Sequence, residues 1–82
     1  MKITVKLLGR YKDIAGTDKI HLEIKEGDVL RDVVNAFVKR YPETERDQKF
    51  MMVLKNKTFV PYETPFLKGD EITLSPPVVS GG

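Results

Sequence analysis

The hydrophobic pattern of this chain changes its period along the sequence, and this change limits the folds open to it. Residues 2–7 and 19–25 alternate polar and apolar side chains, which is typical of strands with one buried face. Residues 30–41 instead place apolar side chains three and four positions apart, as one face of an α-helix requires. Residues 71–75 return to alternation. The pattern therefore predicts two strands, a helix and a closing strand.

Between the helix and the closing strand lies a continuous apolar run over residues 50–54, which has the length of a strand. Its first three residues, Phe50, Met51 and Met52, are most simply core. Residues 55–57 are typical of a turn, and residues 58–60 can return as a short strand. A chain of 82 residues has room for one domain and one core. We therefore expect an α+β fold with one main helix packed on one face of a mixed sheet.

The ends of the helix are marked by residue type. Asp28 is predicted as the N-cap, because its carboxylate can accept hydrogen bonds from the first turn. Asp32 near the start, and Lys39 and Arg40 near the end, complement the helix dipole. Pro42 should stop the helix, since proline restricts the preceding residue and has no N–H to donate.

The composition excludes several classes of function. Without cysteine, the chain has no disulfide, thiolate metal site or cysteine nucleophile, and we expect a cytoplasmic protein with no bound metal or cofactor. Acidic and basic residues are interleaved at a net charge of +2, so no nucleic-acid partner is expected. Nothing resembles a signal peptide or a membrane span. His21 is the only histidine, and its place in the alternation predicts a solvent-facing side chain.

The C-terminal residues 76–82 are the informative part. Pro76 and Pro77 should end the last strand, because proline cannot donate to a sheet. The chain then finishes in Gly81-Gly82, an end without side chains that can pass through a narrow channel. Terminal glycines taken alone are usually frayed chain. We expect a folded domain over residues 1–75 and a flexible tail that reaches about 23 Å when extended.

Three segments together resemble the ending of a known family: Gly69-Asp70-Glu71-Ile72, Pro76-Pro77-Val78 and Gly81-Gly82. They are similar to the GDEV…PPV…GG pattern of the MoaD/ThiS sulfur carriers, and most similar to MoaD, the small subunit of molybdopterin synthase. The order of strands and helix also matches over nearly the whole chain. The resemblance implies the β-grasp fold shared with ubiquitin.

The resemblance also implies that this chain is not an enzyme by itself but the sulfur-donating subunit of one. An ATP-dependent adenylyltransferase of the ubiquitin-activating type would form an acyl-adenylate on Gly82, and a sulfur donor enzyme would convert it to a thiocarboxylate. ATP is used by that partner. In molybdopterin synthase the tail enters the large subunit, so Ser80 and Gly81 would thread a channel. Here two residues, Val79 and Ser80, separate PPV from GG, where the family commonly has one.

Apolar residues beside the tail are candidates for partner binding. Val78, Val79 and Pro77 follow the predicted strand stop, and Leu8 or Phe66 can extend their patch. Packing of Phe66 in the core is the alternative for that residue. Other functions stay open: a sulfur carrier for thiamine thiazole or tRNA thiolation, a ubiquitin-like modifier joined to lysines, or a β-grasp interaction module with an inert tail.

Overall fold

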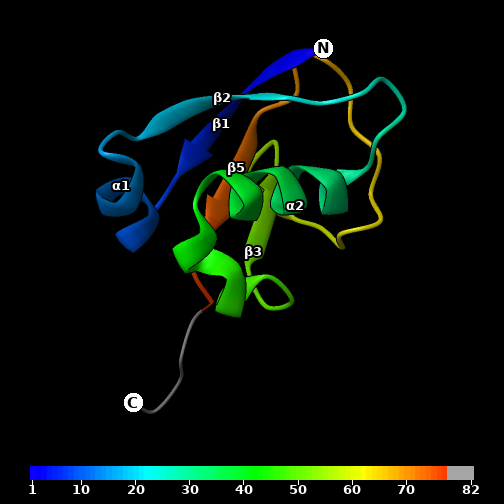
Figure 1. The fold of residues 1–82 in the computed structure, drawn as a ribbon. Helices are drawn as coiled ribbons and strands as arrows, with labels where there is room; N and C mark the ends of the chain where they lie inside the picture. Colours follow the sequence, from blue (N-terminus) through cyan, green and yellow to red (C-terminus); the bar gives the residue numbers. More distant parts are fainter. Residues whose placement is uncertain (78–82) are drawn as a thin grey trace.

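A computed structural model of the chain describes residues 1–77. The predictions made above for residues 78–82 lie outside this described part. The elements are strands β1 (Lys2–Leu7), β2 (Lys19–Glu23), β3 (Met52–Lys55), β4 (Thr58–Phe59) and β5 (Ile72–Ser75), helices α1 (Arg10–Ala15) and α2 (Leu30–Arg40), and the 3₁₀-helix η1 (Pro42–Asp47). The strands form one sheet in the order β2-β1-β5-β3-β4, and α2 crosses one face of it (Figure 1).

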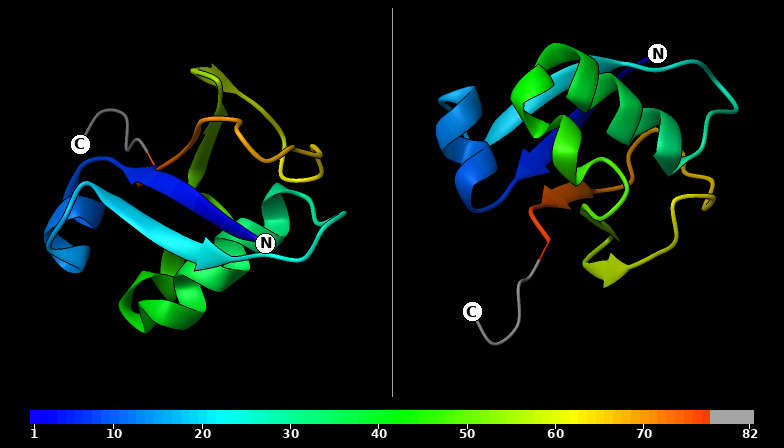
Figure 2. Two further views of the ribbon diagram at one scale, coloured as in Figure 1. Left: turned by 90° about the horizontal axis from the view of Figure 1, so that it is seen from above. Right: turned by 60° about the horizontal axis from the view of Figure 1, so that its bottom comes forward.

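The first and last strands lie side by side in the middle of the sheet. β1 and β5 run parallel, with Val5 opposite Ile72 and Leu7 opposite Leu74, whereas the other neighbouring strands are antiparallel. Figure 2 shows this mixed sheet from two further sides, with α2 against one face. The arrangement is the α+β, β-grasp architecture that the sequence predicts.

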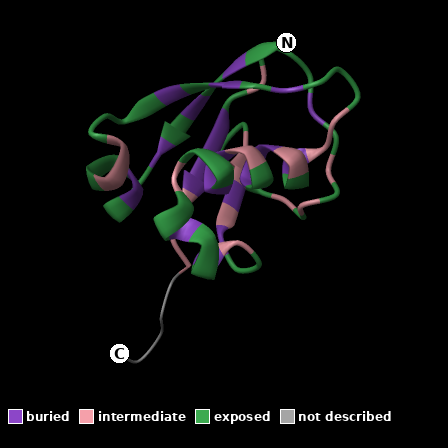
Figure 3. Ribbon diagram, in the orientation of Figure 1, coloured by how far each residue is buried: buried purple, intermediate pink, exposed green. Residues whose placement is uncertain are grey.

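The core lies between α2 and the sheet, as the two periods predict. The helix contributes the apolar side chains spaced three and four residues apart, and all of them are buried: Leu30, Val33, Val34, Phe37 and Val38. The strands contribute every second residue, so buried and exposed positions alternate along β1 and β2 (Figure 3). The inward-facing residues predicted on those strands are all found in the core: Ile3, Val5, Leu7, Ile20, Leu22 and Ile24.

The start of α2 differs from the prediction. The N-cap is Val29 rather than Asp28, and the carboxylate of Asp32 accepts a 2.9 Å hydrogen bond from the Val29 N–H. Asp28 instead accepts a 3.0 Å bond from the N–H of Lys25 and closes the preceding turn. The prediction of Asp28 as the cap was therefore wrong, because its carboxylate binds the N–H of Lys25 in the preceding turn. The end of α2 before Pro42 is confirmed.

Two short helices were not predicted. α1 occupies residues 10–15, which the sequence pattern left without an element, and it ends at Gly16 in the left-handed conformation. η1 occupies most of the stretch between Pro42 and β3, which looked like a purely polar connection. Each buries polar side chains or an aromatic ring on its inner side: Tyr11 in α1, and Thr44 and Asp47 in η1.

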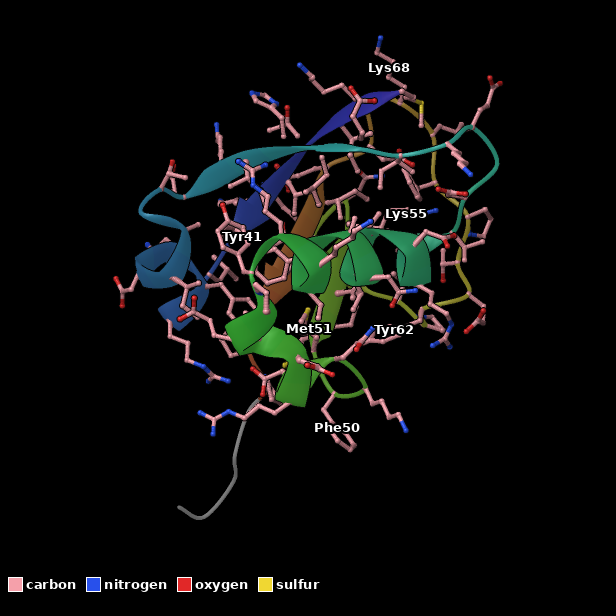
Figure 4. All side chains as sticks on the ribbon, in the orientation of Figure 1. Tyr41, Phe50, Met51, Lys55, Tyr62 and Lys68 are labelled. Atoms are coloured by element: carbon pink, nitrogen blue, oxygen red, sulfur yellow. The ribbon has the colours of Figure 1, made fainter. Side chains whose placement is uncertain are left out.

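The apolar run before β3 is only partly core. Met51 is buried and Met52 half-buried, but 68% of Phe50 is exposed. β3 begins at Met52, so Phe50 belongs to the loop after η1, and its ring points away from the domain (Figure 4). The prediction of Phe50 as a core residue was therefore wrong, since an apolar run does not mark where its strand begins.

Candidate functional site

The expected reacting group and its neighbours lie beyond the described residues. These are the sequence-predicted site residues Val78, Val79, Ser80, Gly81 and Gly82. The structure does describe the place from which they extend, at the end of β5. We call Ser75, Pro76 and Pro77 the tail root. Pro76 and Pro77 are half-buried, so the prolines that end the strand still contact the domain.

The tail root is held by neighbours on both sides of β5. On one side the N–H of Leu8 donates a 3.0 Å hydrogen bond to the carbonyl of Leu74, which continues the pairing of β1 with β5. On the other side Ser75 lies opposite Met52 at the start of β3. The last residue of β5 is therefore fixed between the loop after β1 and the start of β3. This arrangement gives the chain one defined point of exit from the sheet.

The predicted partner-binding residues divide into two groups. Leu8 lies beside β5 and is 36% exposed, so its side chain is accessible close to the tail root. Phe66 is only 8% exposed and belongs to the hydrophobic core. Phe66 is therefore a core residue, as the alternative prediction for it states, and its ring does not extend an exposed apolar patch. Its neighbour Pro65 pairs with Val29 at the start of α2.

An apolar surface that the sequence reasoning missed lies on the sheet face away from α2. One row of paired residues crosses this face from β1 to β4: Lys6, Thr73, Leu54 and Phe59. Met52 lies on the same side of β3, because it is two residues from Leu54. Met52 and Leu54 are half-buried and Phe59 is 61% exposed. We call these three residues the outer-face patch.

The outer-face patch explains the continuous apolar run in β3. In a strand covered on one face only, residues 52 and 54 should be polar, as Lys2, Thr4 and Lys6 are on β1. Apolar residues on both faces of one strand were therefore the signal that could have revealed a second surface. The patch adjoins the tail root, since Met52 pairs with Ser75.

A cluster of polar side chains joins the two short helices α1 and η1. The carboxylate of Asp47 is nearly buried, accepts a 2.8 Å hydrogen bond from the hydroxyl of Tyr11 and forms an ion pair with Arg10. Burial, and then the hydrogen bond to Asp47, raise the pKa of Tyr11 well above its usual value. Every member has a partner, so this cluster fixes structure and offers no free reactive group.

Residues 1–77 hold little that could catalyse a reaction. No group of three or more His, Cys, Asp or Glu side chains within them is placed to bind a metal ion. His21 is exposed, as predicted, and its Nδ1 lies 3.1 Å from the hydroxyl of Thr4 on the neighbouring strand. In the same part of the chain, no helix has the length and apolarity needed to cross a membrane.

Comparisons with known proteins identify the family of the chain. The family described as the ThiS family matches residues 5–82. A candidate molybdopterin converting factor subunit 1 from Pyrococcus furiosus has a TM-score of 0.81 at 24% identity, over 95% of this chain and 99% of that one. SAMP1 from Haloferax volcanii has a TM-score of 0.79 at 26% identity, over the full length of both chains.

A complex of subunits 1 and 2 of the molybdopterin-converting factor from Helicobacter pylori contains a further similar chain. Its TM-score is 0.64 at 21% identity, over 99% of this chain and 100% of that one. The matched family spans nearly the whole chain, including the Gly81-Gly82 end. The chain therefore belongs to the ThiS family and is a ubiquitin-like sulfur carrier or small modifier of the ThiS/MoaD type.

Proposed function

We propose that this protein is a sulfur carrier that works as the small subunit of a molybdopterin synthase, with the carboxylate of Gly82 as its reacting group. The observation that carries the proposal is the Pro-Pro-Val ending followed by Gly81-Gly82, placed directly after the central strand β5. The position matters because a tail that leaves a paired central strand is presented from a fixed point. The similarity to the two-subunit complex from Helicobacter pylori supports the same role.

The proposed chemistry takes place at the chain end, in two steps catalysed by partners. In the first, the Gly82 carboxylate attacks the α-phosphorus of ATP, pyrophosphate leaves, and an acyl-adenylate forms. In the second, hydrosulfide supplied by a sulfur donor enzyme attacks the acyl carbon, AMP leaves with the bonding electrons, and the proton on sulfur is released. The product is a thiocarboxylate, in which one carboxylate oxygen has been replaced by sulfur. This chain supplies the acyl group, and glycine offers it without steric hindrance.

The outer-face patch of Met52, Leu54 and Phe59 is the proposed docking surface for the adenylyltransferase and for the synthase large subunit. A partner that takes the tail into its active site must contact the domain around the tail root. Met52 pairs with Ser75 there, and Leu8 is accessible on the other side. Exposed apolar residues gathered on one face favour a protein interface. Pro77, Val78 and Val79 would continue that contact along the tail.

A second candidate function is conjugation to lysine side chains of other proteins. The similarity to SAMP1, whose name in full is small archaeal modifier protein 1, favours it. Both functions begin with the same adenylation of Gly82 and differ in the nucleophile that attacks afterwards. Isopeptide-linked adducts recovered from cells would indicate the modifier, whereas a thiocarboxylate consumed by a molybdopterin synthase large subunit would indicate the carrier.

The direct test is the intact mass of the protein after incubation with ATP, the adenylyltransferase and a sulfur source. The wild type should gain the mass difference between sulfur and oxygen at the C-terminal residue. A variant without Gly82, or with one alanine added after it, should show no change. Both variants should keep the fold, because the core lies within the described residues 1–77. A chain lacking Gly82 that still transferred sulfur would disprove the mechanism.

A further inference from the structure

Gly9 lies against the tail root, although it precedes Pro76 by most of the length of the chain. It follows β1 and stands next to Leu8, whose N–H is bonded to the carbonyl of Leu74. A Cβ atom placed on Gly9 would lie 3.3 Å from both Cγ and Cδ of Pro76. The bare backbone of Gly9 therefore forms the surface on which the Pro76 ring rests.

We propose that Gly9 is a positioning residue that sets the direction in which the C-terminal tail leaves the domain. Its consequence for catalysis rests on the function proposed above, in which that tail enters a partner's active site. The contact itself joins the loop after β1 to the first residue after β5. Because Pro76 begins the tail, a small rotation there changes the direction in which the chain leaves the sheet.

The chemistry of proline makes this contact directional. The Cδ atom of Pro76 is bonded to its own backbone nitrogen, so the ring cannot turn away as a flexible side chain can. A methyl group on Gly9 would be tighter against the ring than ordinary van der Waals contact allows. The contact would have to open by a few tenths of an ångström, and any part of that shift taken up by the main chain at Pro76 would move the exit of the tail.

Gly9 can be compared with a second glycine that also has a positive φ but has no such neighbour. Gly9 has φ of +59° and ψ of −140°, a region open almost only to glycine, whereas Gly16 has φ of +75° and ψ of 13°, in the left-handed helical region, so alanine strains the backbone more at Gly9. No atom lies within 4 Å of a Cβ placed on Gly16, whereas Pro76 faces Gly9. Replacement by alanine therefore strains the backbone at both positions and crowds the tail root at Gly9 only.

The experiment measures adenylation by the partner enzyme at varied concentrations of the carrier, for the wild type, Gly9→Ala and Gly16→Ala. A tail that points the wrong way from a correctly docked domain lowers kcat by about tenfold or more and leaves KM nearly unchanged. We expect this for Gly9→Ala, with both kinetic constants of Gly16→Ala within about twofold of the wild type. Circular dichroism and urea unfolding report the backbone strain of each variant separately.

A double-mutant cycle separates the contact from the strain. Pro76→Ala removes Cγ and Cδ, so the methyl of Gly9→Ala has no ring to displace. The loss of kcat caused by Gly9→Ala should disappear in the Pro76→Ala background, because the contact is shared and non-additive. An equal loss in both backgrounds, or an equal loss for Gly16→Ala, would overturn the proposal.

Pro76→Ala alone tests the proposal even where Gly9→Ala does not fold. It should lower kcat at unchanged KM, because the tail loses the surface that orients it, and a wild-type kcat would contradict the positioning role. The wild-type reaction keeps the two proposals apart. If wild-type Gly82 is not adenylated, the proposed function has failed. If it is adenylated and both Gly9→Ala and Pro76→Ala match it, only the role of Gly9 has failed.

Discussion

The hydroxyl of Tyr11 donates a 2.8 Å hydrogen bond to the carboxylate of Asp47, a residue 36 positions away in the chain. Tyr11 is fully buried and Asp47 is 7% exposed. This bond joins α1 to η1, and the ring of Tyr11 also packs on Phe37 of α2 at 5.1 Å between centroids. A buried carboxylate thus ties the two short helices of the described chain to the main one.

Tyr11→Phe should lower the free energy of unfolding by about 1–2 kcal/mol, because the buried carboxylate of Asp47 loses a donor. Urea unfolding at neutral pH measures this. Tyr41→Phe is the control, since Tyr41 also packs on Phe37 but is half-buried and outside the cluster. An equal loss for both variants would mean that removal of a tyrosine hydroxyl in general, and not the loss of the bond to Asp47, carries the effect.

The hydrogen bond between Tyr11 and Asp47 should also affect how the unfolding free energy depends on pH in the alkaline range. The pKa of Tyr11 is raised in the folded state, so its stabilising contribution is complete below the unfolded value of 10.0 and is lost as pH rises above it. The unfolding free energies of the wild type and Tyr11→Phe should therefore converge above about pH 10. A difference that stays constant from neutral pH upward would contradict this assignment.

Asp70 should make stability sensitive to acid. Its carboxylate accepts a 2.8 Å bond from the Leu67 N–H and a 3.1 Å bond from the Asn56 amide, which lower its pKa below the model-compound value of 3.8. The stabilisation is present above that value and is lost as pH falls below it. Asp70→Asn should flatten the fall in urea midpoint below about pH 4, whereas Asp13→Asn, at an exposed position of α1, should not.

The sequence predicts the elements whose pattern is long enough to show a period. The eleven residues of α2 and the alternating residues of β1, β2 and β5 fall where expected, because burial on one face imposes that spacing. α1 and η1 have six residues each, less than two helical turns, so their periodicity is not visible. The burial of Asp47 depends on Tyr11, a partner distant in sequence, and no local pattern signals it.

The candidate site could be predicted from the sequence only in part, because some of it depends on contacts between residues distant in the chain. The Gly81-Gly82 end and the prolines before it have a chemical meaning in the sequence itself. The outer-face patch required the pairing of β3 with β5 and β4, which places Leu54 and Phe59 side by side. The contact of Gly9 with Pro76 required the parallel pairing of β1 with β5, a relationship that only the folded chain contains.

Phe59→Ser should weaken binding to the adenylyltransferase by about 2 kcal/mol or more, because an exposed aromatic residue that a partner covers is a typical hot spot. Its effect on the unfolding free energy should stay below about 1 kcal/mol, since 61% of the side chain is exposed. Leu67→Ser is the control: Leu67 is 76% exposed but lies in the loop before β5. Calorimetric titration that gave equal losses for both variants would exclude the outer-face patch as the specific surface.

The extra residue in the tail gives a prediction about what the partner recognises. Deletion of Val79 restores the commoner spacing between PPV and GG, whereas Gly81→Val places a β-branched side chain where bare backbone is expected to thread. Deletion of Val79 should therefore be tolerated better than Gly81→Val in a sulfur-transfer assay with the native partner. The opposite ranking would show that the partner measures tail length and not tail width.

The central place of β5 determines when the sheet can be completed during synthesis. The β2-β1 pair and the β3-β4 pair are joined through β5, so the sheet stays in two pieces until residues 72–75 are in place. Long-range pairing of this kind makes folding wait for distant parts of the chain. During synthesis, the sheet closes only after the ribosome has made β5, and the Gly-Gly end follows within seven residues. A chain released before β5 has been made therefore lacks a closed sheet, and under the function proposed above it also lacks the glycine that is activated.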